Sequence, residues 1–169
     1  MNYPIKRRSG IKMKIIGWVI LAGFAALFSI GCQPNNNIEG TIELNTDSVH
    51  RLINETWNKG HMEVIDEILS PDYILHISSP GEKDRDGYHQ AVRLYREAFP
   101  DFLFTIDDTI AEGDKVVIRA TMTGTHEGNF MGIEPTGQKL TMSVISIRHF
   151  SNGKIIEEWV EMDRSGLTR

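Results

Sequence analysis

The order of hydrophobic patterns in this chain predicts an α+β domain, with about three helices followed by a curved antiparallel sheet. From residue 46 to residue 100 the apolar residues recur mainly with the 3.6-residue period of helices, and from residue 102 onward they alternate with a period of two. Helices grouped before consecutive strands favour a layer of helices on one face of the sheet. The concave side of that sheet is expected to hold a pocket.

Residues 1–31 predict a signal peptide. Five Lys and Arg residues precede the uncharged apolar run 15–31, and the first acidic residue is Glu39. A basic region followed by an apolar one is typical of an export signal. The run of 17 residues is short for a membrane-spanning helix, which needs about 20.

Cys32 follows this run and is the only cysteine, so a disulfide within the chain is excluded. The segment 29–32, Ser-Ile-Gly-Cys, resembles a bacterial lipoprotein signal, in which the thiol is lipidated and the preceding residues are removed. The resemblance implies a membrane anchor at Cys32 on the periplasmic face of the cell envelope. Gln33, where an inner-membrane retention signal usually has Asp, favours the outer membrane if there is one. The alternative is an uncleaved anchor helix with an incidental cysteine.

Residues 32–45 are polar and lack a hydrophobic period, which predicts a flexible tether. Residues 46–169 are then one domain of ordinary size. The whole chain carries 18 Lys and Arg against 23 Asp and Glu, a net charge of −5. Loss of the five leader cations leaves 13 against 23 and about −10. Such a surface repels phosphate backbones, so nucleic-acid binding is not expected.

Three helices are expected before the sheet. The first spans 46–60, with Thr46 or Asp47 as its cap, and the second spans 62–69 and ends before Pro71. The third starts at a cap on Asp86 and ends before Pro100. Their apolar faces are Val49, Leu52, Ile53, Thr56 and Trp57 in the first helix, Val64, Ile65, Ile68 and Leu69 in the second, and Tyr88, Val92, Tyr95 and Phe99 in the third.

One strand, 72–78, is expected among the helices, and two hairpins follow them with turns at 112–115 and 151–154. In the strand after Lys115 the even positions are apolar, which places His126 on the covered face at the far end of that strand. In the last strand Trp159 and Asp163 share one face. If that face is the concave one, Trp159 is a pocket wall, but the opposite face is also partly apolar.

Four segments in this order resemble the SnoaL-like polyketide cyclases and ester cyclases of the nuclear transport factor 2-like superfamily: residues 55–76, 98–108, 112–140 and 152–163. The resemblance covers nearly all of residues 47–163. It implies a cone of three helices on a bent antiparallel sheet around a deep cavity, often in a dimer. It also implies intramolecular aldol closure with no metal or organic cofactor.

The resemblance matches His76, His126, Trp159 and Asp163 to the residues of the family pattern. It implies Asp163 as the base that removes a proton next to a carbonyl, and His126 as the group that polarises the oxygen or returns the proton. Val160 departs from the pattern, because related sequences commonly have a polar or acidic residue after the tryptophan.

The expected ligand site comprises His76, Trp159, Tyr73, Tyr95 and Phe130. Phe130 belongs to the loop 124–137, whose glycines and Pro-Thr-Gly turn predict a rim and lid over the pocket. No H-x-x-x-H, H-E-x-x-H or cysteine pair fixes metal ligands, and no G-x-S-x-G, Walker or dinucleotide loop is present. We therefore expect neither a metal nor another cofactor.

Three functions remain open from the sequence. The domain is a cofactor-independent cyclase or isomerase acting on a small apolar carbonyl compound, a binding module that holds such a molecule unchanged, or an interaction domain that forms homodimers or docks to an envelope partner. All three are compatible with the expected fold.

Overall fold

A computed structural model describes residues 36–77 and 81–163. The chain divides into two compact units, Met1–Asn36 and Asn37–Arg169, and the strands of the described residues lie in the second. The predicted signal peptide and Cys32 lie outside the described residues. Within the described ranges, no helix combines the length and apolarity required to cross a membrane.

The first helix starts much earlier than the sequence predicts. Helix α2 spans Asn36–Arg51 and continues into the π-helix η1, Leu52–Asn58. The prediction of a flexible tether is therefore wrong from residue 36 on, and so is the predicted cap, because the Thr46 hydroxyl donates within the helix to the carbonyl of Ile42 at 2.8 Å. The predicted apolar face is confirmed, since all five of its residues are buried.

Two shorter helices follow, α3 (Glu63–Ile68) and α4 (Arg85–Ala98). The cap of α4 is Asp84 rather than the predicted Asp86: its carboxylate accepts a hydrogen bond from the backbone N–H of Gly87 at 2.8 Å. This bond satisfies one of the free N–H groups of the first turn. The predicted inward side chains of both helices are buried, except that Tyr95 is partly buried.

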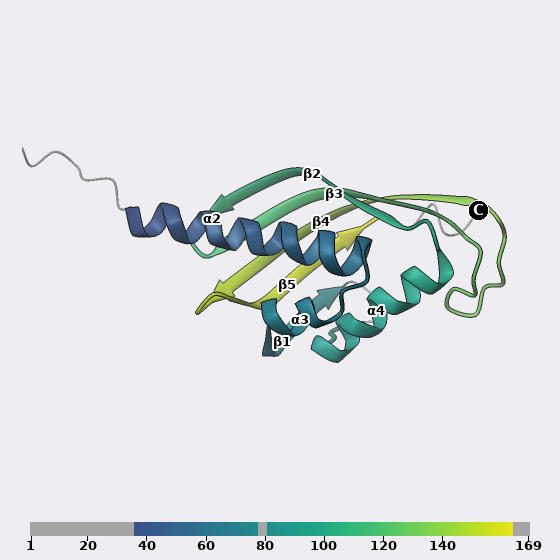
Figure 1. The fold of residues 1–169 in the computed structure, drawn as a ribbon, viewed down its shortest axis with the longest axis horizontal. Coiled ribbons are helices and arrows are strands. Elements are labelled where there is room, and N and C mark those ends of the chain that lie inside the picture. The colour runs from purple at the N-terminus through teal and green to yellow at the C-terminus, as the bar shows by residue number, and fades with distance from the viewer. Residues whose placement is uncertain (1–35, 78–80, 164–169) are drawn as a thin grey trace, which may run out of the picture. The chain divides into compact units, whose positions relative to one another are not determined.

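Five strands form one sheet in the order β1-β5-β4-β3-β2. They are β1 (Leu69–Ile77), β2 (Leu103–Glu112), β3 (Lys115–Thr125), β4 (Lys139–Ser151) and β5 (Lys154–Met162). The four strands from β2 to β5 pair antiparallel, as predicted, whereas β1 pairs parallel with β5 at the edge. Figure 1 shows α2 running across the strands and α4 beside them. Helices packed on one five-stranded mixed sheet confirm the α+β class.

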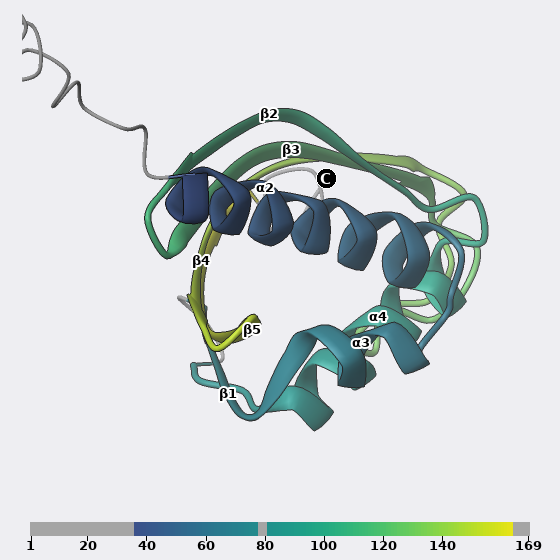
Figure 2. The ribbon, with the colours of Figure 1, turned by 60° about the vertical axis from the view of Figure 1, so that its left-hand side comes forward.

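The inner face of the sheet carries the core. The even positions of β3 and of β4 are buried almost without exception, and the odd positions of β4 face outward. Figure 2 shows the sheet bending from β2 round to β1, with α2, α3 and α4 on its inner side. The hydroxyl of Thr109 on β2 lies 2.9 Å from Nε2 of His50 in α2, so polar contacts as well as apolar ones hold the helix to the sheet.

Candidate functional site

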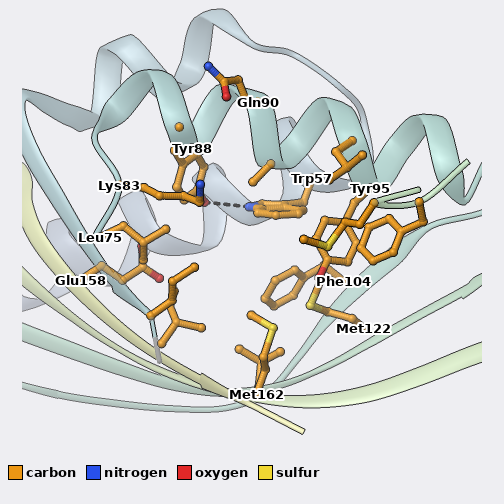
Figure 3. A pocket seen from close by; sticks show the side chains of 18 of the residues that line it. Trp57, Leu75, Lys83, Tyr88, Gln90, Tyr95, Phe104, Met122, Glu158 and Met162 are labelled. Atoms are coloured by element: carbon orange, nitrogen blue, oxygen red, sulfur yellow. Dashed lines mark hydrogen bonds between the residues drawn. The ribbon is translucent and has the colours of Figure 1, made fainter. Parts of the chain in front are cut away.

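A cavity of about 250 Å³ lies between the helices η1 and α4 and the inner face of the sheet. Its volume is just below the roughly 300 to 1,000 Å³ of pockets for drug-sized ligands, so it suits a small molecule. Figure 3 shows side chains from helices and strands converging on this space. The lining residues are Trp57, Leu75, Ile77, Lys83, Gly87, Tyr88, Gln90, Ala91, Leu94, Tyr95, Phe104, Met122, Phe130, Met131, Val144, Arg148, Glu158, Val160 and Met162.

Trp57 stands at the centre of the aromatic part of the cavity wall. It lies in η1, where Leu52, Ile53, Thr56 and Trp57 are the buried residues. Its ring is 5.7 Å from the rings of Tyr88, Tyr95 and Phe104. Its Nε1–H donates to the hydroxyl of Tyr88 at 2.7 Å (Figure 3). Short π-helical segments recur at functional sites, and here the segment positions an aromatic side chain on the cavity.

The polar part of the wall is a buried ion pair. Arg148 on β4 and Glu158 on β5 are directly paired in the sheet, and both project to the inner face. Nη2 of Arg148 lies 2.7 Å from Oε1 of Glu158, and the two side chains are 3% and 2% exposed. The hydroxyl of Tyr73 donates to the other carboxylate oxygen at 2.7 Å. A buried carboxylate with two such partners is fixed in place.

Burial and these charges shift the ionisation of the neighbouring groups. Burial raises the pKa of the Tyr73 hydroxyl well above its usual value, and the negative charge of Glu158 raises it further. The pKa of Tyr88 is raised for the same two reasons. Burial alone would lower the pKa of Arg148, but the negative charge of Glu158 and the neighbouring Tyr88 and Tyr73 hydroxyls together outweigh it, and the pKa is raised. Both tyrosines are therefore neutral hydrogen-bond donors, and the arginine is a cation.

Some N–H donors of Arg148 have no hydrogen-bond acceptor among the described residues. Its Nε and Nη1 atoms are buried and have no hydrogen-bond partner among the described residues. Buried N–H groups are nearly always paired in proteins, and an unpaired one costs free energy. Since this guanidinium lines the cavity, these atoms are the clearest polar feature that a ligand can satisfy.

The loop between β3 and β4 forms part of the cavity wall. Phe130 is buried, Met131 at the tip is exposed, and both line the cavity, so the predicted rim is observed. The loop is fastened to the end of α4, because the backbone N–H groups of Glu127 and Gly128 both donate to the carbonyl of Ala98. Its role as a lid stays a prediction.

Of the residues expected to bind a ligand, Tyr95 and Phe130 line the cavity. Tyr73 lies behind the ion pair and contacts Glu158 instead. His126 is buried as the strand parity predicts, but it is not part of the cavity lining. Its ring stacks on Phe99 at 5.3 Å, and its Nδ1 lies 3.1 Å from the Thr136 hydroxyl.

His76, Trp159 and Asp163 lie on the opposite face of the sheet, so the prediction that they meet His126 in the pocket is wrong. Trp159 is 38% exposed, and its ring stacks on that of His76 at 5.1 Å. Nε2 of His76 lies 2.8 Å from a carboxylate oxygen of Glu157. Asp163 is exposed and its backbone N–H donates to the carbonyl of Ser143.

A β-bulge explains this error. The register between β4 and β5 shifts between His149 and Phe150, so that Ile156 has no partner of its own. An extra residue in one strand reverses the facing of all residues beyond it. Ile155 is therefore buried, whereas Trp159, of the same parity, points outward.

Arg148 and Glu158 were missed at the sequence level. The available signal was a charged residue at the inward parity of a strand whose other inward residues are apolar or small: Met142, Val144, Ser146 and Phe150, with Arg148 between the last two. Charged side chains at such positions are rarely buried unless they are paired. Among the described residues, no three His, Cys, Asp or Glu side chains form a cluster that could hold a metal ion.

The profile of the SnoaL-like polyketide cyclase family matches residues 47–169. The chain belongs to this family. No curated protein matches it. The family match starts inside α2 and includes every residue of the cavity wall.

Solved structures share the fold of this SnoaL-like domain. A candidate SnoaL-like polyketide cyclase from Jannaschia sp. CCS1 is 25% identical with a TM-score of 0.67, over 73% of this chain and 88% of that one. IdmH, a candidate polyketide cyclase from Streptomyces antibioticus, is 29% identical with a TM-score of 0.63, over 72% and 94%. AclR from Streptomyces galilaeus, a candidate hydroxylase, is 28% identical with a TM-score of 0.67, over 75% and 79%.

The residue that follows the tryptophan of the SnoaL-like pattern lines the cavity. In this chain that residue is Val160. Among the described residues that line the cavity, Glu158 is the only carboxylate. Any proton transfer by a side-chain carboxylate inside this cavity would therefore fall to Glu158.

Proposed function

We propose that this SnoaL-like domain binds one small, largely apolar molecule in the cavity. The observation that carries the proposal is a cavity lined mainly by apolar and aromatic side chains with a single buried polar cluster, Arg148, Glu158 and Tyr88, in its wall. Apolar pockets with a few convergent polar groups are the usual form of small-molecule sites. The apolar wall supplies affinity and the polar cluster orients the ligand.

Native mass spectrometry of the full-length protein tests the binding function. We expect a co-purified small molecule, or uptake of added aromatic ketones at one per chain. Replacing Met122 by Trp fills the space with a side chain from the sheet and is expected to abolish uptake, because Met122 lines the cavity and is 2% exposed. Uptake that is unchanged in this variant would place the ligand elsewhere and contradict the proposal. The matched control is Ile145→Trp on the outer face of β4, because Ile145 is 52% exposed and does not line the cavity.

A second candidate function is acid–base conversion of the bound carbonyl compound, such as an aldol cyclisation or isomerisation. Family membership and the buried carboxylate of Glu158 favour it. The ion pair argues against it, because both carboxylate oxygens already have partners, Nη2 of Arg148 and the Tyr73 hydroxyl, and neither is free to approach a substrate proton. If the protein turns over a ketone, we expect Glu158→Gln to lose at least about a hundredfold in rate. Full rate in Glu158→Gln would rule out Glu158 as the base.

We further propose that the domain is anchored to the cell envelope through a lipid on Cys32. The support is the segment 29–32 after a basic and an apolar region. Replacing Cys32 by Ser is expected to move the protein from the membrane fraction to the soluble fraction. A variant that stays in the membrane fraction would favour the uncleaved anchor helix instead.

A further inference from the structure

We propose that the ligand is held by an uncharged acceptor oxygen, as in a ketone, ester or amide, and that Arg148 and Tyr88 are the residues that receive it. This inference rests on the proposed binding function and names the chemical group at the polar end of the ligand. It starts from the buried donors of Arg148 that have no partner among the described residues.

The geometry of the guanidinium sets the first requirement. Nη2 is committed to Glu158 at 2.7 Å, which leaves Nε and Nη1 for another acceptor. Arginine has five N–H donors and no acceptor, so the missing partner must supply oxygen or another lone pair. Arg148 is 2% exposed, and bulk water therefore does not satisfy these donors in the way it satisfies those of a surface arginine.

Tyr88 supplies the second donor. Its hydroxyl oxygen accepts a hydrogen bond from Nε1 of Trp57 at 2.7 Å, so its own proton is left to donate. The residue is 3% exposed and lines the cavity. Its ring lies 5.9 Å from that of Tyr73, whose hydroxyl donates to Glu158, so Tyr88 neighbours the ion pair. Two kinds of donor thus meet at one end of the cavity.

The charge balance decides between a neutral oxygen and a carboxylate. The charge of Arg148 is already neutralised by Glu158, so a bound anion would be a second negative charge in a buried site, which is costly. Lys83 also lines the cavity. It lies in the wall shared with a neighbouring hollow, which is lined by Glu82, Asp84 and Asp86. Lys83 is only partly buried, so solvent screens its charge, and the buried end of the cavity favours an uncharged ligand.

The test uses three probes of nearly equal shape: 2-acetylnaphthalene, 2-isopropenylnaphthalene, in which a CH₂ group replaces the carbonyl oxygen, and 2-naphthoate. Equilibrium dialysis of the full-length protein in lipid nanodiscs, with empty nanodiscs as the blank, gives the Kd of each. We expect the ketone to bind about ten- to a hundredfold more tightly than the alkene, as expected for hydrogen bonds to a charged donor. The naphthoate is expected to bind more weakly than the ketone.

Two variants locate the donors. Arg148→Lys keeps a cation next to Glu158 but removes the guanidinium donors, and Tyr88→Phe removes one hydroxyl and leaves the ion pair intact. Both are expected to lose most of the preference for the ketone while binding the alkene as before. If Arg148→Lys does not fold, Tyr88→Phe carries the test alone.

One further variant is the matched control. Arg119→Lys makes the same change at an exposed arginine on β3 that pairs with Asp107. It is expected to keep the preference for the ketone.

The outcomes separate this inference from the proposed function. If the alkene binds as tightly as the ketone, the cavity is a binding site, but the proposal that Arg148 and Tyr88 bind the ligand oxygen is refuted. If both Arg148→Lys and Tyr88→Phe keep the preference of the unmodified protein, the oxygen is bound elsewhere and the assignment is wrong. Tighter binding of the naphthoate than of the ketone would overturn the charge argument. If none of the probes binds, both the proposed function and the inference fail.

Discussion

Replacing Arg148 by Met should destabilise the domain far more than removing an arginine from a surface pair. The methionine has a similar length and fills similar space, but it leaves the carboxylate of Glu158, 1% exposed, with the Tyr73 hydroxyl as its partner in the sheet interior. Two unit charges about 4 Å apart attract by about 4 kcal/mol at an effective dielectric constant of about 20. Breaking a buried pair by removing one partner typically costs about 3 to 5 kcal/mol.

Urea unfolding followed by circular dichroism measures this loss. We expect a reduction of about 3 to 5 kcal/mol in the free energy of unfolding at pH 7. Because an isolated buried carboxylate is relieved by taking up a proton, the loss should shrink as the pH falls toward 4. The double variant Arg148→Met, Glu158→Met removes both charges and should recover most of the stability, since apolar replacements of buried pairs are often neutral or stabilising.

The control is Arg119→Met, which breaks a pair whose arginine is 57% exposed and should cost about 0 to 1 kcal/mol. A loss in Arg148→Met no larger than in this control would refute the reasoning. It would mean that water reaches Glu158 and that the surroundings of the ion pair do not have a low dielectric constant. Failure of the double variant to recover stability would show that the loss came from packing rather than from charge.

Three further predictions concern the scaffold. Gly128→Ala should lower the free energy of unfolding by about 1 to 3 kcal/mol in urea unfolding, because a Cβ there would lie 2.3 Å from the carbonyl oxygen of Glu97; a neutral effect would contradict the close packing of loop and helix. Gly40→Ala should instead stabilise α2 by about 1 kcal/mol, since no atom lies within 4 Å of the added Cβ, and a loss in thermal melting would argue against that helix. The hydrogen bonds from the backbone N–H and the hydroxyl of Thr125 lower the pKa of Asp101 in the folded protein. The ionised carboxylate therefore stabilises the fold at pH values above its unfolded pKa. This stabilisation is lost as the pH falls through the lower pKa of the folded state. Asp101→Asn should therefore be less stable than the unmodified protein at pH 6 but not at about pH 2, and a difference independent of pH would be inconsistent with this assignment.

The sequence was sufficient for the order of elements because each depends on local periodicity. The alternation along 115–126 predicts which side chains of β3 are buried, including His126, and the structure agrees. The start of the first helix could not be predicted in this way. Of residues 38–45 only Asn45 is buried and five are exposed, so no buried apolar face marks this segment as helical. These residues continue a helix whose buried part begins at Asn45 and Val49.

The candidate site was harder to predict because it depends on register. The pattern from Ile155 to Asp163 has apolar residues on both faces, and only the bulge opposite His149 and Phe150 decides which face is inner. Once the bulge is known, Trp159 and Asp163 must point outward, and Glu158 and Val160 must point inward. Because of a single unpaired residue in β5, the carboxylate that faces the cavity is that of Glu158 and not that of Asp163.

This displacement changes which function the cavity can support. An exposed Asp163 on the outer face cannot abstract a proton from a molecule inside, while Glu158 reaches the cavity but is already bound to a cation and a hydroxyl. Where the family pattern has a polar or acidic residue, this cavity has Val160. With its inward carboxylate engaged in an ion pair and with free donors on Arg148, the site is better equipped to hold an oxygen than to remove a proton. For this member of the family, binding therefore deserves to be measured before turnover.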